Sequence, residues 1–288
     1  MEPDRLLMVI GALVYTCAAA LTLASLARRQ PPPHQVVFGL VLIGFGIQST
    51  GLHLRGVSVG GCPIGNTFEV LQFISWSVIL VYVFTGAVYR VTILGAVSAT
   101  LAAVLALTSA AVPAWDATRR TNLFGGNVWV EIHAALAFLS YGIFGLLAAT
   151  SVLFLLQNYS LKKKLWPSRL RFLPSVVQLE AINLRLLAVG FAVFTTALCI
   201  AFIHVFAHPA AVFPTKLLST VLLWIAYGIV LVLRMRQSLF GRRLAWVNAV
   251  LFLFALVTLW SVEASRKDNS PEPPPAAQAA PVRSPGDS

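Results

Sequence analysis

The sequence predicts an all-α polytopic membrane protein, a bundle of about eight transmembrane helices. Of the 288 residues, 58% are hydrophobic and only 11% are charged, whereas a soluble domain carries about 25% charged residues. The mean hydropathy of +0.82 extends over most of the chain, so its apolar surface exceeds what one soluble core can bury. The expected solvent is therefore the lipid bilayer.

Eight apolar runs are each long enough to cross a bilayer, which takes about 20 helical residues. They cover residues 6–27, 35–54, 68–89, 91–112, 129–157, 181–206, 216–234 and 244–263. The first run is preceded by the two acids of Met-Glu-Pro-Asp-Arg and followed by Arg28 and Arg29. Because a cleavable signal peptide has the opposite order of charges, we expect this run to be a retained helix.

The chain divides into one transmembrane domain, residues 1–263, and a tail, residues 264–288. The tail contains six prolines and no aromatic residue, Leu or Ile, so it cannot build a core and is expected to be disordered. No soluble domain is left once the helices and the tail are subtracted. Any function is therefore expected within the bundle or at its two faces.

The basic residues predict the orientation of the helices. Thirteen of the 21 Lys and Arg lie in or beside the loops after the first, third, fifth and seventh runs, and the other eight lie on the opposite side. The positive-inside rule then places those loops in the cytoplasm and both termini outside. The rule also explains the net charge of +11, so no nucleic-acid partner is expected. The basic segment 161–180 is expected to lie along the cytoplasmic interface.

The cysteines and histidines indicate which chemistry to expect. The three cysteines lie far apart and form no CxxC or CxxCH motif, which argues against thiol redox chemistry and covalent haem attachment. Four of the five histidines fall on the outer side: His53, His133, His204 and His208. Neutral imidazole is a good axial ligand for haem iron. The propionates of a haem held there would reach bases such as Arg55, Arg119 or Arg120.

The same histidines have ordinary structural roles open to them. His53 and His208 fit polar residues of the membrane interface, and His34 fits the same role on the cytoplasmic side. His133 fits a capping residue or a residue that makes an interhelical hydrogen bond. His204 and His208 are four residues apart, which places them on one helical face if the helix extends that far.

Two glutamates near helix ends also have two interpretations each. Asn66 and Glu69 lie in the sequence NTFE before an apolar run, the pattern of a helix N-cap with a supporting carboxylate. Glu69 alternatively lines a polar cavity on the outer face. Glu131, at the start of the run 129–157, either shares such a role or pairs with an arginine of the outer face.

Four stretches resemble the CcsA/HemX cytochrome c assembly family, whose members are multi-helix, haem-handling membrane proteins. They are GGCPIGNTFEVLQFISW at 60–76, WVEIHAALAFLSYGIF at 129–144, LPSVVQLEAINLRLLAVGFAVFTTAL at 173–198 and KLLSTVLLWIAYGIVLVLRMRQSLFGRRLAW at 216–246. The resemblance implies that His133 corresponds to a haem-ligand histidine of the outer face. It also implies that a companion assembly subunit acts with the protein.

The sequence departs from the haem-transporting members of that family. Their tryptophan-rich WWD segment has no counterpart, because no Trp and no Asp occurs between residues 167 and 223. Gly61 stands where the family often has histidine, and the region after the last run lacks a second outer histidine. The chain thus looks closer to the HemX and YpjD-like branch, which lacks the complete WWD motif.

The leading hypothesis is a non-enzymatic, multi-pass protein of the bacterial cytoplasmic (inner) membrane that supports cytochrome c biogenesis or haem handling. It would bind haem transiently, with His133 as the iron ligand and His204 or His208 as the second. The alternative is a membrane scaffold that regulates a haem-biosynthesis enzyme or an exporter through segment 161–180 and binds no ligand. A secondary transporter is a weaker third hypothesis, because no acidic residue lies at mid-membrane depth.

Overall fold

Eight α-helices form the structure, a computed structural model that describes residues 2–28, 30, 33–89, 92–121, 125–163, 175–207 and 214–268. The helices are α1 (Pro3–Ala27), α2 (His34–Val59), α3 (Thr67–Tyr89), α4 (Thr92–Ala111), α5 (Val128–Lys162), α6 (Val176–Ala207), α7 (Pro214–Met235) and α8 (Gly241–Asp268). A short 3₁₀ helix, η1 (Pro113–Asp116), follows α4. The predicted all-α class is confirmed.

Seven helices, α1 to α7, contain a stretch long and apolar enough to cross a membrane within the described residues. The sequence predicted eight such stretches, and α8 is not among the seven. α8 continues to Asp268, five residues beyond the expected end of the helical domain at 263. Residues 164–174 of the predicted interfacial segment and residues 269–288 of the predicted tail lie outside the described part of the chain. The polytopic helical bundle is confirmed.

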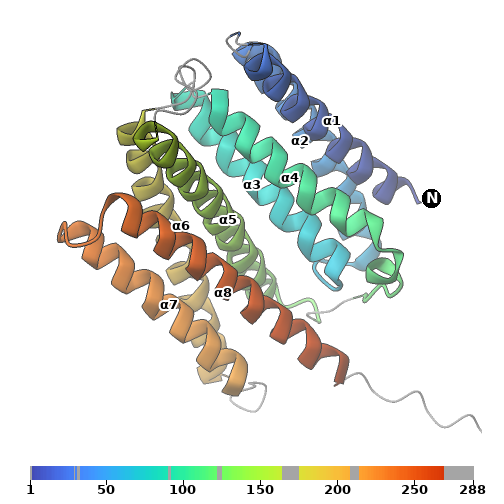
Figure 1. Ribbon diagram of the computed structural model, residues 1–288. Helices are drawn as coiled ribbons and strands as arrows, with labels where there is room; N and C mark the ends of the chain where they lie inside the picture. The colour runs from blue at the N-terminus through green and yellow to red at the C-terminus, as the bar shows by residue number, and fades with distance from the viewer. Residues whose placement is uncertain are drawn as a thin grey trace, which may run out of the picture.

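The helices form two groups, α1–α4 and α5–α8, which lie side by side in Figure 1. α5 connects them, because it packs against α6 and α8 in its own group and against α3 and α4 in the other. α7 packs mainly on α6 and α8. Only 17% of the most apolar stretch within Leu217–Met235 is buried inside the protein, so most of α7 is available to lipid.

Glycines allow the closest helix crossings. A Cβ added to Gly44 of α2 would lie 2.7 Å from the ring of Tyr15 on α1. A Cβ added to Gly142 of α5 would lie 2.5 Å from the Cβ of Ser77 on α3. Small residues let helix backbones approach closely in lipid, where packing replaces the hydrophobic effect as the driving force. Gly142 therefore sets the distance between the two helix groups.

Replacing Gly142 with valine should separate α3 from α5 and destabilise the bundle by about 1–3 kcal/mol, the usual cost of overpacking a tight interior. The matched control is Gly46→Val on α2, since nothing lies within 4 Å of a Cβ at that position. Thermal unfolding of the purified proteins in detergent measures the difference. Equal melting temperatures for the two variants would show that the α3–α5 crossing is not tight.

The loop between α2 and α3 is closed by hydrogen bonds at the start of α3. Oδ1 of Asn66 accepts a hydrogen bond from the backbone N–H of Glu69 at 2.8 Å, and Oε2 of Glu69 accepts one from the N–H of Gly65 at 2.7 Å. The predicted N-cap at the NTFE sequence is thereby confirmed. The cap fixes the position of the Glu69 carboxylate, whose second oxygen is used in the site described next.

Candidate functional site

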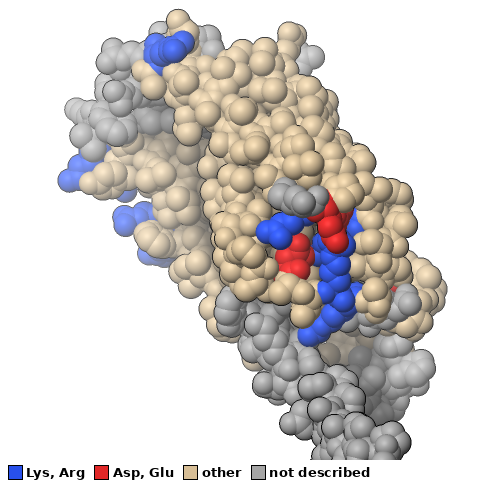
Figure 2. Space-filling view, turned by 90° about the vertical axis from the view of Figure 1, so that its right-hand side faces the viewer, with Lys and Arg blue, Asp and Glu red and all other residues tan. Residues whose placement is uncertain are grey.

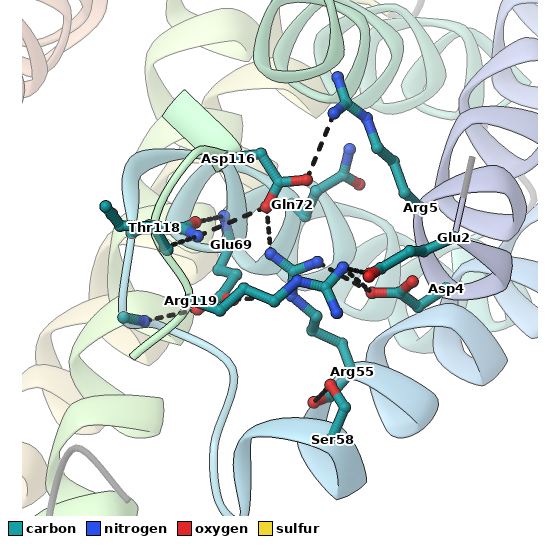
Figure 3. Close-up of polar contacts among 12 residues, drawn as sticks. Glu2, Asp4, Arg5, Arg55, Ser58, Glu69, Gln72, Asp116, Thr118 and Arg119 are labelled. Atoms are coloured by element: carbon teal, nitrogen blue, oxygen red, sulfur yellow. Dashed lines mark hydrogen bonds and ion pairs between the residues drawn. The ribbon is translucent and has the colours of Figure 1, made fainter. Parts of the chain in front are cut away.

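Arg55, in the last turns of α2, is fully buried and is paired with three carboxylates from three other elements. Its Nε donates to Glu69 of α3 at 2.7 Å and its Nη1 to Asp4 of α1 at 2.9 Å. Its Nη2 pairs with Asp116 of η1. The three carboxylates converge on one guanidinium (Figure 3), and we call these four residues the Arg55 cluster.

Two further arginines surround the cluster. Nη1 of Arg5 lies 3.4 Å from Asp116, and Nη2 of Arg119 lies 3.3 Å from Asp4 and also pairs with Glu2. The guanidinium carbons of Arg5 and Arg55 lie 5.6 Å and 5.5 Å from the ring centre of Phe68, within cation–π range. Three bases thus offset four acids. Figure 2 shows acidic and basic residues close together on one face of the protein.

This arrangement corrects one expectation from the sequence. Arg55 was expected to be available to haem propionates, but it is fully buried and all three of its guanidinium nitrogens contact carboxylates. Arg119 is partly exposed but is shared between Glu2 and Asp4. Arg120, beside Gly65, makes no ion pair within the described residues. Of the three arginines, Arg120 is therefore the most available to an anionic ligand.

A chain of buried hydrogen bonds continues from the cluster along α3, on the face that carries Glu69, Gln72 and Ser75. Nε2 of Gln48 on α2 donates to Oε1 of Gln72 at 2.9 Å, and Nε2 of Gln72 donates to Ser109 of α4 at 2.9 Å. The hydroxyl of Tyr15 on α1 donates to Gln48 at 2.9 Å. These bonds connect all four helices of the first group, as polar side chains commonly do inside membranes.

His133 lies in the second turn of α5, and its Nδ1 is 2.8 Å from the carbonyl oxygen of Ala197 on α6. A carbonyl oxygen only accepts hydrogen bonds, so Nδ1 carries the proton in this contact. In neutral imidazole the lone pair is then on Nε2. Metal-binding histidines almost always have this arrangement, in which the second ring nitrogen donates to a carbonyl or a carboxylate.

The other predicted histidines have different positions. α6 extends through His204, seven residues or two turns after Ala197, which places its backbone about 10.5 Å further along the helix. His208 lies outside the described residues. His53 is exposed on α2, and His34 begins the same helix at the opposite end, stacked on Phe38 at 6.0 Å. No group of three or more His, Cys, Asp or Glu that could hold a metal ion occurs in the described part of the chain.

Glu131 of α5 reaches the loop between α2 and α3. Its Oε1 lies 2.7 Å from the position that a Cβ on Gly61 would take. Any side chain at position 61 would therefore displace the Glu131 carboxylate. The predicted pairing of Glu131 with an arginine is not observed among the described residues. Glu131 and Gly61 are therefore matched in size at this contact between α5 and the loop.

Cys62, in the same loop, has a thiol whose pKa is raised to about 11, chiefly by burial and secondarily by the negative charges of Glu131 and Glu69. At pH 8 its alkylation by a maleimide, which requires the thiolate, should be about a hundredfold slower than that of a thiol with the ordinary pKa near 9. The measurement uses protein with Cys17 and Cys199 replaced by Ala.

Replacing Glu131 with Gln removes a charge that opposes the thiolate, so the pKa of Cys62 falls and alkylation becomes faster. Glu2→Gln, at the edge of the Arg55 cluster, is the control and should leave the rate unchanged. The same protein unfolded in SDS supplies the rate of an unshielded thiol. If folded and unfolded proteins reacted equally fast, the loop would not bury Cys62 as described.

These observations define a class: a polytopic helical membrane protein in which the Arg55 cluster and His133 lie towards the same end of the bundle. The family described as "Cytochrome C assembly protein" matches residues 64–267. The chain belongs to that family, which confirms the resemblance noted in the sequence. The match covers α3 to α8 almost completely, and therefore includes Glu69, Asp116 and His133 of the candidate site but not Asp4 or Arg55.

Three relatives are similar over different lengths. The chain is 25% identical to Protein HemX of Bacillus subtilis (strain 168) over 77% of its own length and 82% of that protein. It is 27% identical to Protein HemX of Brevibacillus brevis over 54% of its length, which spans only 57% of that relative. An uncharacterized 28.8 kDa protein of Azospirillum brasilense is 28% identical over 46% of the chain and 49% of that protein.

Proposed function

We propose that this protein supports cytochrome c biogenesis by holding haem transiently beside His133, with the imidazole as an axial ligand to the iron. The observation that carries the proposal is the contact between Nδ1 of His133 and the Ala197 carbonyl. It favours the tautomer that has its lone pair on Nε2, the form that binds iron. The protein acts without catalysing a reaction.

The surroundings of His133 suit a porphyrin. Trp129 lies four residues earlier on the same face of α5 and is 66% exposed, and Ile132 is 39% exposed. These side chains offer apolar surface to the macrocycle. Arg120, which lies beside Gly65 in the loop before α3, would offer a positive charge to a propionate. In this proposal His204 or His208 supplies the second axial ligand. Haem, when bound, contributes the iron centre of the future cytochrome, and the chain's own residues orient it.

We further propose in which membrane the protein lies and which way its helices face. The protein resides in the bacterial cytoplasmic membrane with both termini outside, because thirteen of the 21 Lys and Arg fall on the side opposite His133. On the outer side a companion subunit of cytochrome c assembly would receive the haem. Such a partner would replace the WWD segment that this chain lacks.

A second candidate function is a scaffold for a haem-biosynthesis enzyme or an exporter. One observation favours it: Lys162 and Lys163, at the described start of segment 161–180, are exposed and make no ion pair within the described residues. An acidic surface of a partner would complement them. This function requires no haem in the bundle.

An absorption titration distinguishes the two functions. Protein purified in detergent and mixed with haemin should develop a shifted Soret band that saturates at one haem per chain. The scaffold function instead predicts the spectrum of free haemin at every ratio. It also predicts a co-purifying partner that is lost when Lys162 and Lys163 are neutralised. A spectrum that never departs from that of free haemin would refute the haem-binding proposal.

A further inference from the structure

A groove lies between the last turns of α5 and the first turns of α8, at the basic end of the bundle, far from His133. Its volume is about 330 Å³. Its lining is mostly apolar and includes Leu156, Tyr159, Trp246 and Ala249. Lys162 and Arg242 belong to the same lining, at the helix ends where the groove opens.

The groove is basic at the helix ends and mostly apolar further along α5. Lys162 and Arg242 are exposed and make no ion pair within the described part of the chain, so both charges are available. The lining extends back along α5 to Val152, ten residues before Lys162. At 1.5 Å per residue this corresponds to about 15 Å along the helix axis. The positively charged mouth at the helix ends therefore continues into an open, mostly apolar groove whose length along α5 is about half of a hydrocarbon core of about 30 Å.

Trp246 and Tyr159 lie beside the mouth, 53% and 59% exposed. Tryptophan and tyrosine prefer the level of the lipid headgroups, so they indicate that the mouth lies at the membrane interface. A ligand that fits must place negative charge at this level and an apolar chain below it. Inorganic phosphate lacks the apolar chain, and in a zwitterionic lipid the cationic part of the headgroup offsets the negative charge of the phosphate.

We infer that this groove binds an anionic phospholipid, with its phosphate between Lys162 and Arg242 and one acyl chain along Leu156 and Ala249. Basic pockets between transmembrane helices on the cytoplasmic side are known to recognise anionic headgroups. The site is independent of the proposed haem function.

Trp246 provides the measurement, because bromine atoms on an acyl chain quench tryptophan fluorescence at contact distance. The protein is reconstituted in phosphatidylcholine nanodiscs with increasing amounts of dibrominated phosphatidylglycerol. The Trp246→Phe variant supplies the signal of the other six tryptophans, to be subtracted. Half-maximal quenching of Trp246 should require far less brominated phosphatidylglycerol than brominated phosphatidylcholine.

The double variant Lys162→Gln/Arg242→Gln should raise the half-maximal fraction of phosphatidylglycerol about 30-fold, since each juxtamembrane base contributes about 1 kcal/mol. The matched control is Lys163→Gln/Arg243→Gln, which removes the same charge from neighbouring exposed residues that do not line the groove. It should change the fraction less than threefold. Ala249→Phe fills the groove without altering charge. It should abolish the preference of the Trp246 site for brominated phosphatidylglycerol over brominated phosphatidylcholine.

Three outcomes would overturn the inference. If the half-maximal fraction of phosphatidylglycerol rose equally in the two double variants, anionic lipid would be attracted to this end of the bundle in general and not to the groove. Equal quenching by the two brominated lipids in the unmodified protein would show no headgroup recognition. Displacement of the quenching lipid by 10 mM inorganic phosphate would show a phosphate site in which the acyl chain contributes nothing.

Discussion

Replacing Arg55 with leucine is expected to destabilise the folded protein by about 3–5 kcal/mol, the cost of removing one partner from a buried ion pair. Three carboxylates, from Asp4, Glu69 and Asp116, face the guanidinium. Without Arg55 they repel one another where little water reaches them. The first consequence should be loosening of the start of α1 and of η1 at the end of α2, because Asp4 and Asp116 both contact this residue.

The measurement is the melting temperature in detergent together with the amount of protein in the membrane. Arg55→Lys should restore only part of the stability that Arg55→Leu loses, since one ammonium cannot reproduce three nitrogens directed at three carboxylates. The control is Arg5→Gln, which removes an outer arginine at 22% exposure and should cost less than about 1 kcal/mol. Wild-type stability in Arg55→Leu would mean that the cluster does not hold the helices together.

Replacing His133 with alanine is expected to lower haem affinity about 100-fold or more, because loss of the ligand itself should exceed the 10- to 100-fold effect of altering a ligand's supporting partner. Trp129 lies one turn away, so quenching of tryptophan fluorescence by haem reports the binding curve. Protein abundance should change little, since the partly buried hydrogen bond from His133 to Ala197 is worth only about 1 kcal/mol.

Two histidine controls accompany this variant. His53→Ala changes an exposed histidine of α2, and His34→Ala changes one at the opposite end of the same helix. Neither should alter haem affinity. If His133→Ala bound haem as tightly as the unmodified protein, the ligand assignment would be wrong. If His34→Ala lost haem, the site would lie at the basic end instead.

The general fold was predictable because hydropathy and length determine it. The run 129–157 became α5, and the NTFE sequence became an N-cap, as local patterns predict. The sequence predicted eight membrane spans, whereas seven helices of the described residues qualify as spans, and α8 is not one of them. Such features depend on neighbouring residues in the sequence, which is why a single chain is enough to find them.

The Arg55 cluster was not predicted, because its members lie 51, 14 and 61 residues from Arg55 along the chain. In the sequence, Asp4 is distinguished only by the order of charges around the first apolar run, and no local pattern distinguishes Asp116. One sequence signal was present: the acids of these segments all fall at helix ends on the predicted outer side. Gln48 and Gln72 gave a second signal, since amides within apolar runs require partners.

The most direct test of the haem proposal is the absorption spectrum of haem-loaded His133→Gly protein before and after addition of imidazole. If the side chain of His133 is an axial ligand, the variant should lose the wild-type Soret position, and free imidazole should restore it by occupying the vacated space beside Ala197. The same addition should leave the His53→Gly spectrum unchanged. A His133→Gly protein whose spectrum already equals that of the unmodified protein would contradict the account.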